Sequence, residues 1–152
     1  MTKFDGSFYV AHYNTFMVGA AADLYELTVS GYGGNATDAF SSNSGEQFST
    51  TDQDNDGYAS GHCGNLYGAG WWYPHLCGTV FLNGAYAGAS HSGGTGIVWV
   101  PITGTTSSFE TVVMKKSSGF VRRRGEQKQV KAEEMLPQGG QKQVEAEEML
   151  PQ

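Results

Sequence analysis

The sequence contains little charge, little proline and few cysteines. Charged residues make up 16% of the 152 positions, and the chain has four prolines and two cysteines. Two cysteines form at most one disulfide, which excludes a small fold stapled by several bridges. A zinc site would need further soft ligands, and only His62 and His75 lie close in sequence. No apolar run approaches the ~18 residues that cross a bilayer, and residues 1–8 lack the apolar stretch of a signal peptide.

Positive charge is also scarce over most of the chain. Residues 1–120 carry three Lys or Arg against nine Asp or Glu, a net charge of −6, whereas residues 121–152 carry six of each. The acidic body would repel a phosphate backbone, so nucleic acid is not an expected partner. Three carboxylates crowd together at Asp52, Asp54 and Asp56, and a bound cation is their simplest counter-charge.

The abundant residues are glycine, of which there are 22, and aromatics, at 12%. This composition favours a loop-rich fold with a small aromatic core. Alternation over residues 25–29 predicts a strand with one buried face, bracketed by Asp23-Leu24 and by residues 31–34. Residues 15–22 are expected to form a strand that enters a turn at Gly19. Residues 31–118 predict long loops with regular structure only near 96–100 and 109–115.

The C-terminal part of the chain is a tandem duplicate. Residues 125–138 recur as residues 139–152 with two changes. Each copy ends in Pro-Gln and offers only Val, Met and Leu as large apolar side chains, too few to form a core. We therefore expect residues 121–152 to form a disordered tail with transient helix, either as a solvated extension or as a partner-binding segment.

The acidic run from Asp52 to Gly57 places oxygen ligands at alternate residues, which suits calcium. An EF-hand would need a bidentate glutamate at the twelfth position of the loop, but Cys63 stands there. No amphipathic helices flank the run either. The remaining alternatives from the residues alone are a calcium loop of another type and a solvated acidic turn.

Several motifs together resemble one known family. They are residues 48–56 (FSTTDQDND), Gly61-His62-Cys63, Gly70-Trp71-Trp72-Tyr73, Cys77 and Leu82-Asn83-Gly84-Ala85-Tyr86, supported by residues 25–32, residues 96–99 and Met114-Lys115. This pattern is similar to the fibrinogen C-terminal domain of ficolins, tachylectins and tenascins, over roughly residues 4–117. The resemblance implies an α+β fold in residues 1–120, with a partial antiparallel sheet and a loop-rich calcium-binding subdomain.

The resemblance also implies a calcium site. Its side-chain ligands would be Asp54 and Asp56, and its backbone carbonyl ligands Tyr58 and either Ser60 or Gly61. The second carbonyl is ambiguous because one extra residue separates Asp56 from Cys63 compared with the usual family spacing. Asp52 would shape the loop or add outer charge.

The same resemblance implies a disulfide between Cys63 and Cys77. A closed loop of about 15 residues stabilises the folded chain by ~3 kcal/mol. A disulfide requires an oxidising compartment, and Asn35-Ala36-Thr37 is a matching glycosylation sequon.

Lectin-like members of the family hold acetyl groups in a pocket ringed by aromatics. Tyr67 matches one of these aromatics, whereas Gly78 and Gly93 occupy two other positions and the fourth falls on Thr106 or Ser107. His91 lies nearby and is expected at the surface. Trp71, Trp72 and Tyr73 are expected in the core rather than in a sugar-stacking platform.

The leading functional expectation is a secreted, calcium-dependent recognition module of the innate-immune lectin type, binding carbohydrate or acetylated surfaces. The alternative is a fibrinogen- or tenascin-like module that binds a protein ligand and no sugar. An enzyme is not expected, because no activated nucleophile accompanies the aspartates and His62 or His91. Family domains carry a long stretch before the position of Phe4, so this chain is expected to be a fragment or to expose sheet edges that allow a homo-oligomer.

Overall fold

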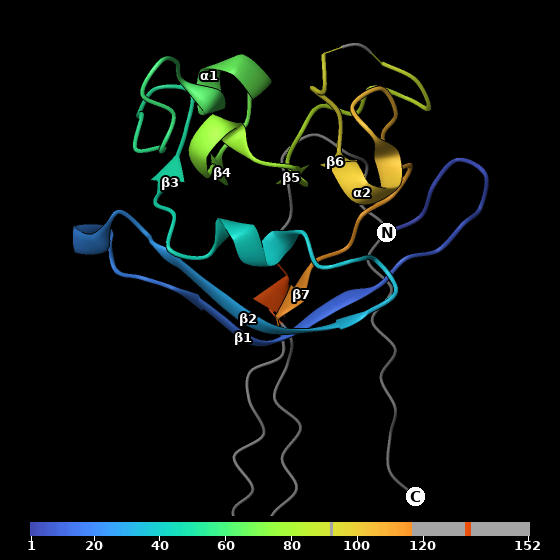
Figure 1. Cartoon of the computed structure of the whole chain (residues 1–152), viewed down its shortest axis with the longest axis horizontal. Helices are drawn as coiled ribbons and strands as arrows, with labels where there is room; N and C mark the ends of the chain where they lie inside the picture. Colours follow the sequence, from blue (N-terminus) through green and yellow to red (C-terminus); the bar gives the residue numbers. More distant parts are fainter. Residues whose placement is uncertain (92, 117–132, 135–152) are drawn as a thin grey trace, which may run out of the picture.

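The computed structural model describes residues 1–91, 93–116 and the backbone of residues 133–134. A long β-hairpin lies beneath a loop-rich part made of short elements (Figure 1). The elements are β1 (Ala11–Val18), η1 (Ala21–Asp23), β2 (Leu27–Gly34), η2 (Phe40–Asn43), β3 (Phe48–Ser49), α1 (Cys63–Tyr67), β4 (Trp71–Trp72), η3 (His75–Cys77), β5 (Val80–Phe81), β6 (Val98–Trp99), α2 (Val100–Thr103), β7 (Lys115–Lys116) and β8 (Glu133–Glu134). Small antiparallel sheets with short helices confirm the α+β, loop-rich fold.

The hairpin pairs β1 with β2 in antiparallel register, from Ala11 opposite Gly34 to Val18 opposite Leu27. The predicted turn at Gly19 is confirmed, since β1 ends one residue before it. The second strand is displaced from its prediction. Tyr25 lies outside it in a left-handed conformation (φ 57°), and β2 continues through the glycines at 31–34 that were expected to end it. Glycine has no Cβ and fits an extended strand as well as a turn, so the predicted C-terminal end of this strand, before residue 31, was wrong.

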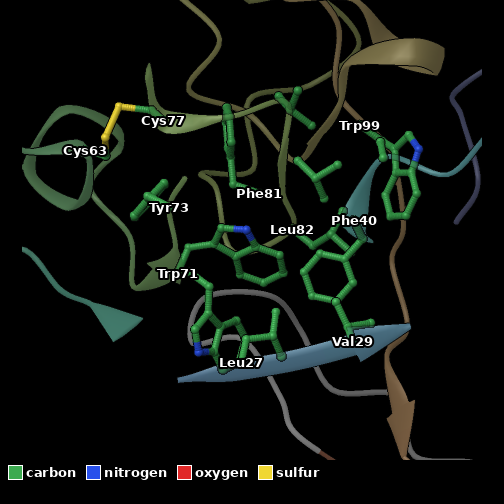
Figure 2. Packing of buried hydrophobic residues seen from close by; sticks show 14 of the residues in the cluster. Leu27, Val29, Phe40, Cys63, Trp71, Tyr73, Cys77, Phe81, Leu82 and Trp99 are labelled. Carbon is green, nitrogen blue, oxygen red and sulfur yellow. A yellow bond between two sulfur atoms is a disulfide. The ribbon is translucent and has the colours of Figure 1, made fainter. Parts of the chain in front are cut away.

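Aromatic side chains fill the space between the hairpin and the loop-rich part. Leu27 and Val29 face upward from β2, and Trp71 lies above them (Figure 2). Phe40 of η2 packs on Trp71 with ring centroids 5.4 Å apart. The expected core position of the tryptophans is confirmed, since Trp71, Trp72 and Tyr73 are no more than 3% exposed.

The strands and helices above the hairpin are two to five residues long. Several of them lie between residues 40 and 81, where only loops were expected. Near residues 96–100 the two-residue strand β6 runs directly into α2. Over residues 109–115 the expected regular structure is limited to an isolated bridge at Thr111 before β7 begins at Lys115. Loops of this kind depend on side-chain bonds for their shape, and Asn43 is an example. Fully buried, it donates from Nδ2 to the carbonyl oxygen of Trp72 at 2.7 Å.

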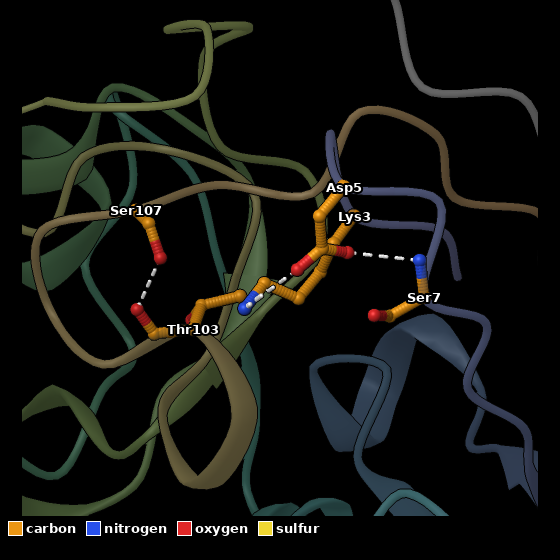
Figure 3. Close-up of polar contacts among 5 residues, drawn as sticks. All are labelled: Lys3, Asp5, Ser7, Thr103 and Ser107. Atoms are coloured by element: carbon orange, nitrogen blue, oxygen red, sulfur yellow. Dashed lines mark hydrogen bonds and ion pairs between the residues drawn. The ribbon is translucent and has the colours of Figure 1, made fainter.

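The N-terminal residues form a small turn against the end of the described domain. Asp5 accepts a hydrogen bond from the Ser7 backbone N–H at 2.8 Å and lies 3.9 Å from the Lys3 ammonium (Figure 3). Figure 3 also shows the turn after α2, where the Ser107 hydroxyl donates to the Thr103 carbonyl.

The predicted tail, residues 121–152, lies outside the described residues except for the backbone of β8, which pairs with β7. In the part of the chain that the structure describes, no helix is long and apolar enough to cross a membrane.

Candidate functional site

The acidic loop between β3 and α1 is closed at its base by polar side chains. Asn55 bonds to β3 twice, through its backbone N–H to Ser49 Oγ at 2.9 Å and through Nδ2 to the Phe48 carbonyl oxygen at 2.8 Å. On the other side of the base, the ring of His62 bonds to the Thr50 carbonyl oxygen at 2.7 Å. These contacts hold both ends of the loop together without a strand ladder. Asn55 was not singled out from the sequence, although it lies between Asp54 and Asp56 of the motif.

The three aspartates have different surroundings. Asp56 is half-buried, and its two oxygens accept the backbone N–H groups of Tyr58 at 2.8 Å and Cys63 at 2.7 Å. Asp54 is exposed and accepts the Asp56 N–H at 3.2 Å. Asp52 is exposed and accepts the Thr50 hydroxyl at 2.6 Å, a hydrogen bond that lowers the pKa of its carboxyl. Asp56 therefore shapes the loop in addition to any ligand role. Asp52 lies within the turn that the Thr50 N–H and the Gln53 carbonyl oxygen close at 2.9 Å.

A fourth carboxylate, Glu46, lies beside the loop and was not singled out from the sequence. Burial, and secondarily the charge of Asp56, raises its pKa. Its Oε2 would lie 3.7 Å from a Cβ placed on Gly57, next to Asp56. Glu46 belongs to no periodic pattern or motif in the sequence, so nothing there predicts that it lies near Asp56 and Gly57. The folded chain brings these residues together.

The disulfide between Cys63 and Cys77 is confirmed, with an S–S distance of 2.02 Å. It joins the start of α1 to η3, and its Cys63 is the residue whose N–H reaches Asp56. Leu76, Cys77 and Gly78 have positive φ angles of 59°, 64° and 73°. Left-handed backbone costs about 1–2 kcal/mol at a residue with a Cβ, so packing and the bridge must hold this segment in place. The His75 ring also contacts the Gly57 carbonyl oxygen, at 3.2 Å, across the loop.

The residues of this loop fit calcium in their chemistry. All nominated donors are hard oxygens, and no Lys or Arg pairs with Asp52, Asp54, Asp56 or Glu46 in the described ranges. Each oxygen of Asp56 accepts one N–H and keeps a further lone pair. The Tyr58 carbonyl oxygen likewise accepts a single bond, from Gly61 N–H at 3.0 Å.

Side chains alone would supply too few oxygen ligands for a calcium ion. Within residues 1–91 and 93–116, no three His, Cys, Asp or Glu side chains gather into a metal cage. Backbone carbonyls such as those of Tyr58 and Ser60, together with water, would have to complete the coordination.

The predicted pocket residues have different immediate neighbours. Tyr67 stacks on Phe81 with ring centroids 4.3 Å apart and on Tyr73 at 6.0 Å. The loop carrying Gly93 comes close to it, because a Cβ on the adjacent Gly94 would lie 3.9 Å from a Tyr67 ring carbon.

A Cβ on Gly78 would lie 2.6 Å from Pro74 Cγ, so this position packs against the chain just before η3. Apart from its chain neighbours, no atom of the described residues lies within 4 Å of a Cβ placed on Gly93. Of the aromatic ring positions that the resemblance implies, Tyr67 is thus the one that carries a ring, and it stacks on the core residues Phe81 and Tyr73.

Two further residues named from the sequence have defined surroundings. His91 is not a surface histidine, because both its ring nitrogens are buried and have no hydrogen-bond partner within the described part of the chain. It packs against Gly96, where a Cβ would lie 2.5 Å from its Nε2. Asn35 is exposed, and its side-chain amide bonds to the Val10 N–H at 2.7 Å and the Phe8 carbonyl oxygen at 3.3 Å. Glycosylation at Asn35 stays a prediction.

Taken together, these features define a loop-rich α+β domain with a disulfide beside an acidic loop. Residues 1–118 match the family described as "Fibrinogen beta and gamma chains, C-terminal globular domain". The chain belongs to this family, as the resemblance implied.

Known relatives agree with the family. The chain is 39% identical over 121 residues to Fibrinogen C domain-containing protein 1-B of Xenopus laevis, a match covering 76% of this chain and 26% of that protein. It resembles the solved fibrinogen-like globe domain of human ANGPTL2 with a TM-score of 0.67 and 33% identity, over 71% of this chain and 50% of that one.

A third similar structure is a lamprey fibrin D-dimer complexed with the peptide ligand Gly-His-Arg-Pro-amide. It has a TM-score of 0.65 and 25% identity, and the match covers 83% of this chain and 48% of that one. The chain thus spans about half of these solved structures and about a quarter of the Xenopus relative.

Proposed function

We propose that the chain is a calcium-dependent recognition module of an extracellular protein. The observation that carries the calcium part is the loop itself. The Asp56 carboxylate lies beside Glu46, Asp54 lies two residues before Asp56, and no basic side chain pairs with any of the three in the described residues. Calcium bound by Asp54, Asp56 and the carbonyls of Tyr58 and Ser60 would supply the missing positive charge. The disulfide supports an oxidising, extracellular location.

For the ligand we propose a protein or peptide, ahead of an N-acetylated sugar. An acetyl methyl needs ring faces that exclude water. Gly93 and Gly78 carry no ring, and Gly78 packs against Pro74, so neither supplies a ring face beside Tyr67. An extended peptide can be bound through hydrogen bonds to its main chain, so it does not require a wall of aromatic rings. The peptide complex of the lamprey relative supports the same class of ligand.

Two resins test the ligand class on the full chain. One carries Gly-His-Arg-Pro-amide through its C-terminus, and the other carries N-acetylglucosamine. The proposal predicts retention on the peptide resin in calcium, release by chelator, and no retention on the sugar resin. Chelator-sensitive retention on the sugar resin alone would restore the lectin hypothesis. Calcium-independent behaviour on both would contradict the recognition proposal.

A further inference from the structure

Glu46 is a carboxylate that reaches the acidic loop from outside the loop's own sequence. It lies between η2 and β3, and its backbone is held by the core of the domain. The Leu27 N–H of β2 donates to the Glu46 carbonyl oxygen at 2.9 Å, and the Glu46 N–H donates to the Asn43 carbonyl oxygen at 3.3 Å. Leu27 and Asn43 are both fully buried. The Glu46 side chain therefore extends from a segment fixed to the hairpin, not from the loop.

The half-buried side chain of Glu46 lies against Gly57, which stands between Asp56 and Tyr58. Asp56 and the carbonyl of Tyr58 are both nominated calcium ligands. A Cβ placed on Gly57 would lie 3.7 Å from Glu46 Oε2 and 3.3 Å from the backbone nitrogen of His75. Glu46 therefore faces the part of the loop that would bind the ion.

The negative charge of Glu46 has no compensating partner. No basic nitrogen, histidine included, lies within ion-pair distance of it in the described residues. Burial raises the pKa of the Glu46 carboxyl, and the charge of Asp56 raises it further. Both causes disfavour the ionised form in the folded chain. The calcium-free domain thus holds two like charges near each other beside the proposed ion site.

We propose that Glu46 is a determinant of calcium affinity in this domain, acting through its charge from outside the set of ligands. This inference rests on the calcium part of the proposed function. Among the described residues, no three Asp, Glu, His or Cys side chains gather closely enough to hold a metal ion. Glu46 therefore does not join Asp54 and Asp56 as a third ligand. A cation bound by Asp56 would instead offset the repulsion between Asp56 and Glu46.

This arrangement makes the stability of the hairpin and core depend on calcium. Without the ion, the repulsion acts between the loop and a segment whose backbone is bonded to β2. With the ion, both carboxylates are attracted to one cation, which holds the loop against that segment. Glu46 thus lowers the stability of the calcium-free form and raises the affinity for calcium, and both effects have the same origin.

The test measures calcium binding by isothermal titration calorimetry on the full chain and three variants. Glu46→Gln keeps the shape of the side chain without its charge, and Glu46→Asp keeps the charge on a shorter side chain. Glu110→Gln is the matched control, because it removes the same charge from an exposed glutamate. The Glu110 N–H donates to the Thr2 carbonyl oxygen at 2.9 Å, so this residue lies at the N-terminal turn.

Glu46→Gln should raise the calcium dissociation constant roughly five- to tenfold, because a unit charge near a divalent ion contributes on that order in largely hydrated surroundings. Glu46→Asp should keep most of the wild-type affinity, and Glu110→Gln should keep all of it. Thermal melting gives a second readout. Glu46→Gln should melt above the wild type in chelator, and this gap should close in saturating calcium.

The outcomes that would overturn this role are distinct. A wild-type chain that binds no calcium contradicts the proposed function and the role of Glu46 with it. Calcium binding by the wild type with an unchanged dissociation constant in Glu46→Gln contradicts the role of Glu46 alone. Equal weakening by Glu46→Gln and Glu110→Gln would assign the effect to net charge. Equal weakening by Glu46→Gln and Glu46→Asp would contradict an action through charge.

Discussion

Asp56 is predicted to have a structural role that Asp54 does not share. Both oxygens of Asp56 accept backbone N–H groups, from Tyr58 at 2.8 Å and Cys63 at 2.7 Å. Asp56→Asn keeps one acceptor and turns an NH2 group toward the other N–H. Losing one hydrogen bond to a charged group costs about 1.5–3 kcal/mol. For a domain of this size that is a fall in melting temperature of roughly 5–10 °C.

The assay is thermal melting followed by circular dichroism, first in chelator and then in excess calcium. Asp54→Asn is the matched control, because Asp54 is exposed and an amide oxygen can accept its one bond, from Asp56 N–H at 3.2 Å. In chelator it should cost less than about 0.5 kcal/mol. In calcium both variants should lose the stabilisation that calcium gives the wild type. Equal destabilisation of both variants in chelator would refute the division of roles.

Three further outcomes follow from the same region. Replacing Cys63 and Cys77 together by serine should destabilise the chain by ~3 kcal/mol in urea unfolding, and an unchanged midpoint would contradict this. Gly78→Ala should destabilise by about 1–3 kcal/mol, because φ is 73° and the added methyl meets a proline ring carbon at 2.6 Å. Wild-type melting of that variant would show that the turn is not as described. Burial, and then the charge of Asp56, raises the pKa of Glu46, so ionised Glu46 destabilises the fold. Glu46→Gln should therefore melt higher than wild type in chelator at neutral pH. The gain should shrink as pH falls through the pKa of Glu46, and a pH-independent difference would contradict this cause.

Sequence reasoning identified the parts of this molecule that have a local or motif signal. Tyr25, Leu27 and Val29 were placed on one buried face by their alternation. The structure places Leu27 and Val29 in the core, whereas Tyr25 is 50% exposed. The disulfide followed from the family motif and is present. Trp71 and Trp72 were assigned to the core from their size and are nearly fully buried.

The features that were missed depend on contacts distant in sequence. Glu46 gains its neighbour Asp56 only when β3 and the loop fold back on each other. The backbone N–H of His91 donates to the Thr106 carbonyl oxygen at 2.9 Å, and the ring nitrogens are buried beside Gly96, an arrangement for which the sequence has no periodicity. The β2 boundary was misplaced because glycine fits an extended strand and a turn equally well. Gly78 was grouped with Tyr67 by family position, whereas its own surroundings are formed by Pro74.

Calcium binding by the acidic loop is the central claim, and one measurement tests it most directly. The full chain is melted in excess calcium, in excess magnesium and in chelator, at one protein concentration. Calcium at 100 times its dissociation constant should stabilise the fold by about 2.7 kcal/mol, a rise of several degrees over the chelated form. Magnesium should give little or none of this rise, because it demands a smaller, near-octahedral site. Identical melting curves in calcium and chelator would contradict the account.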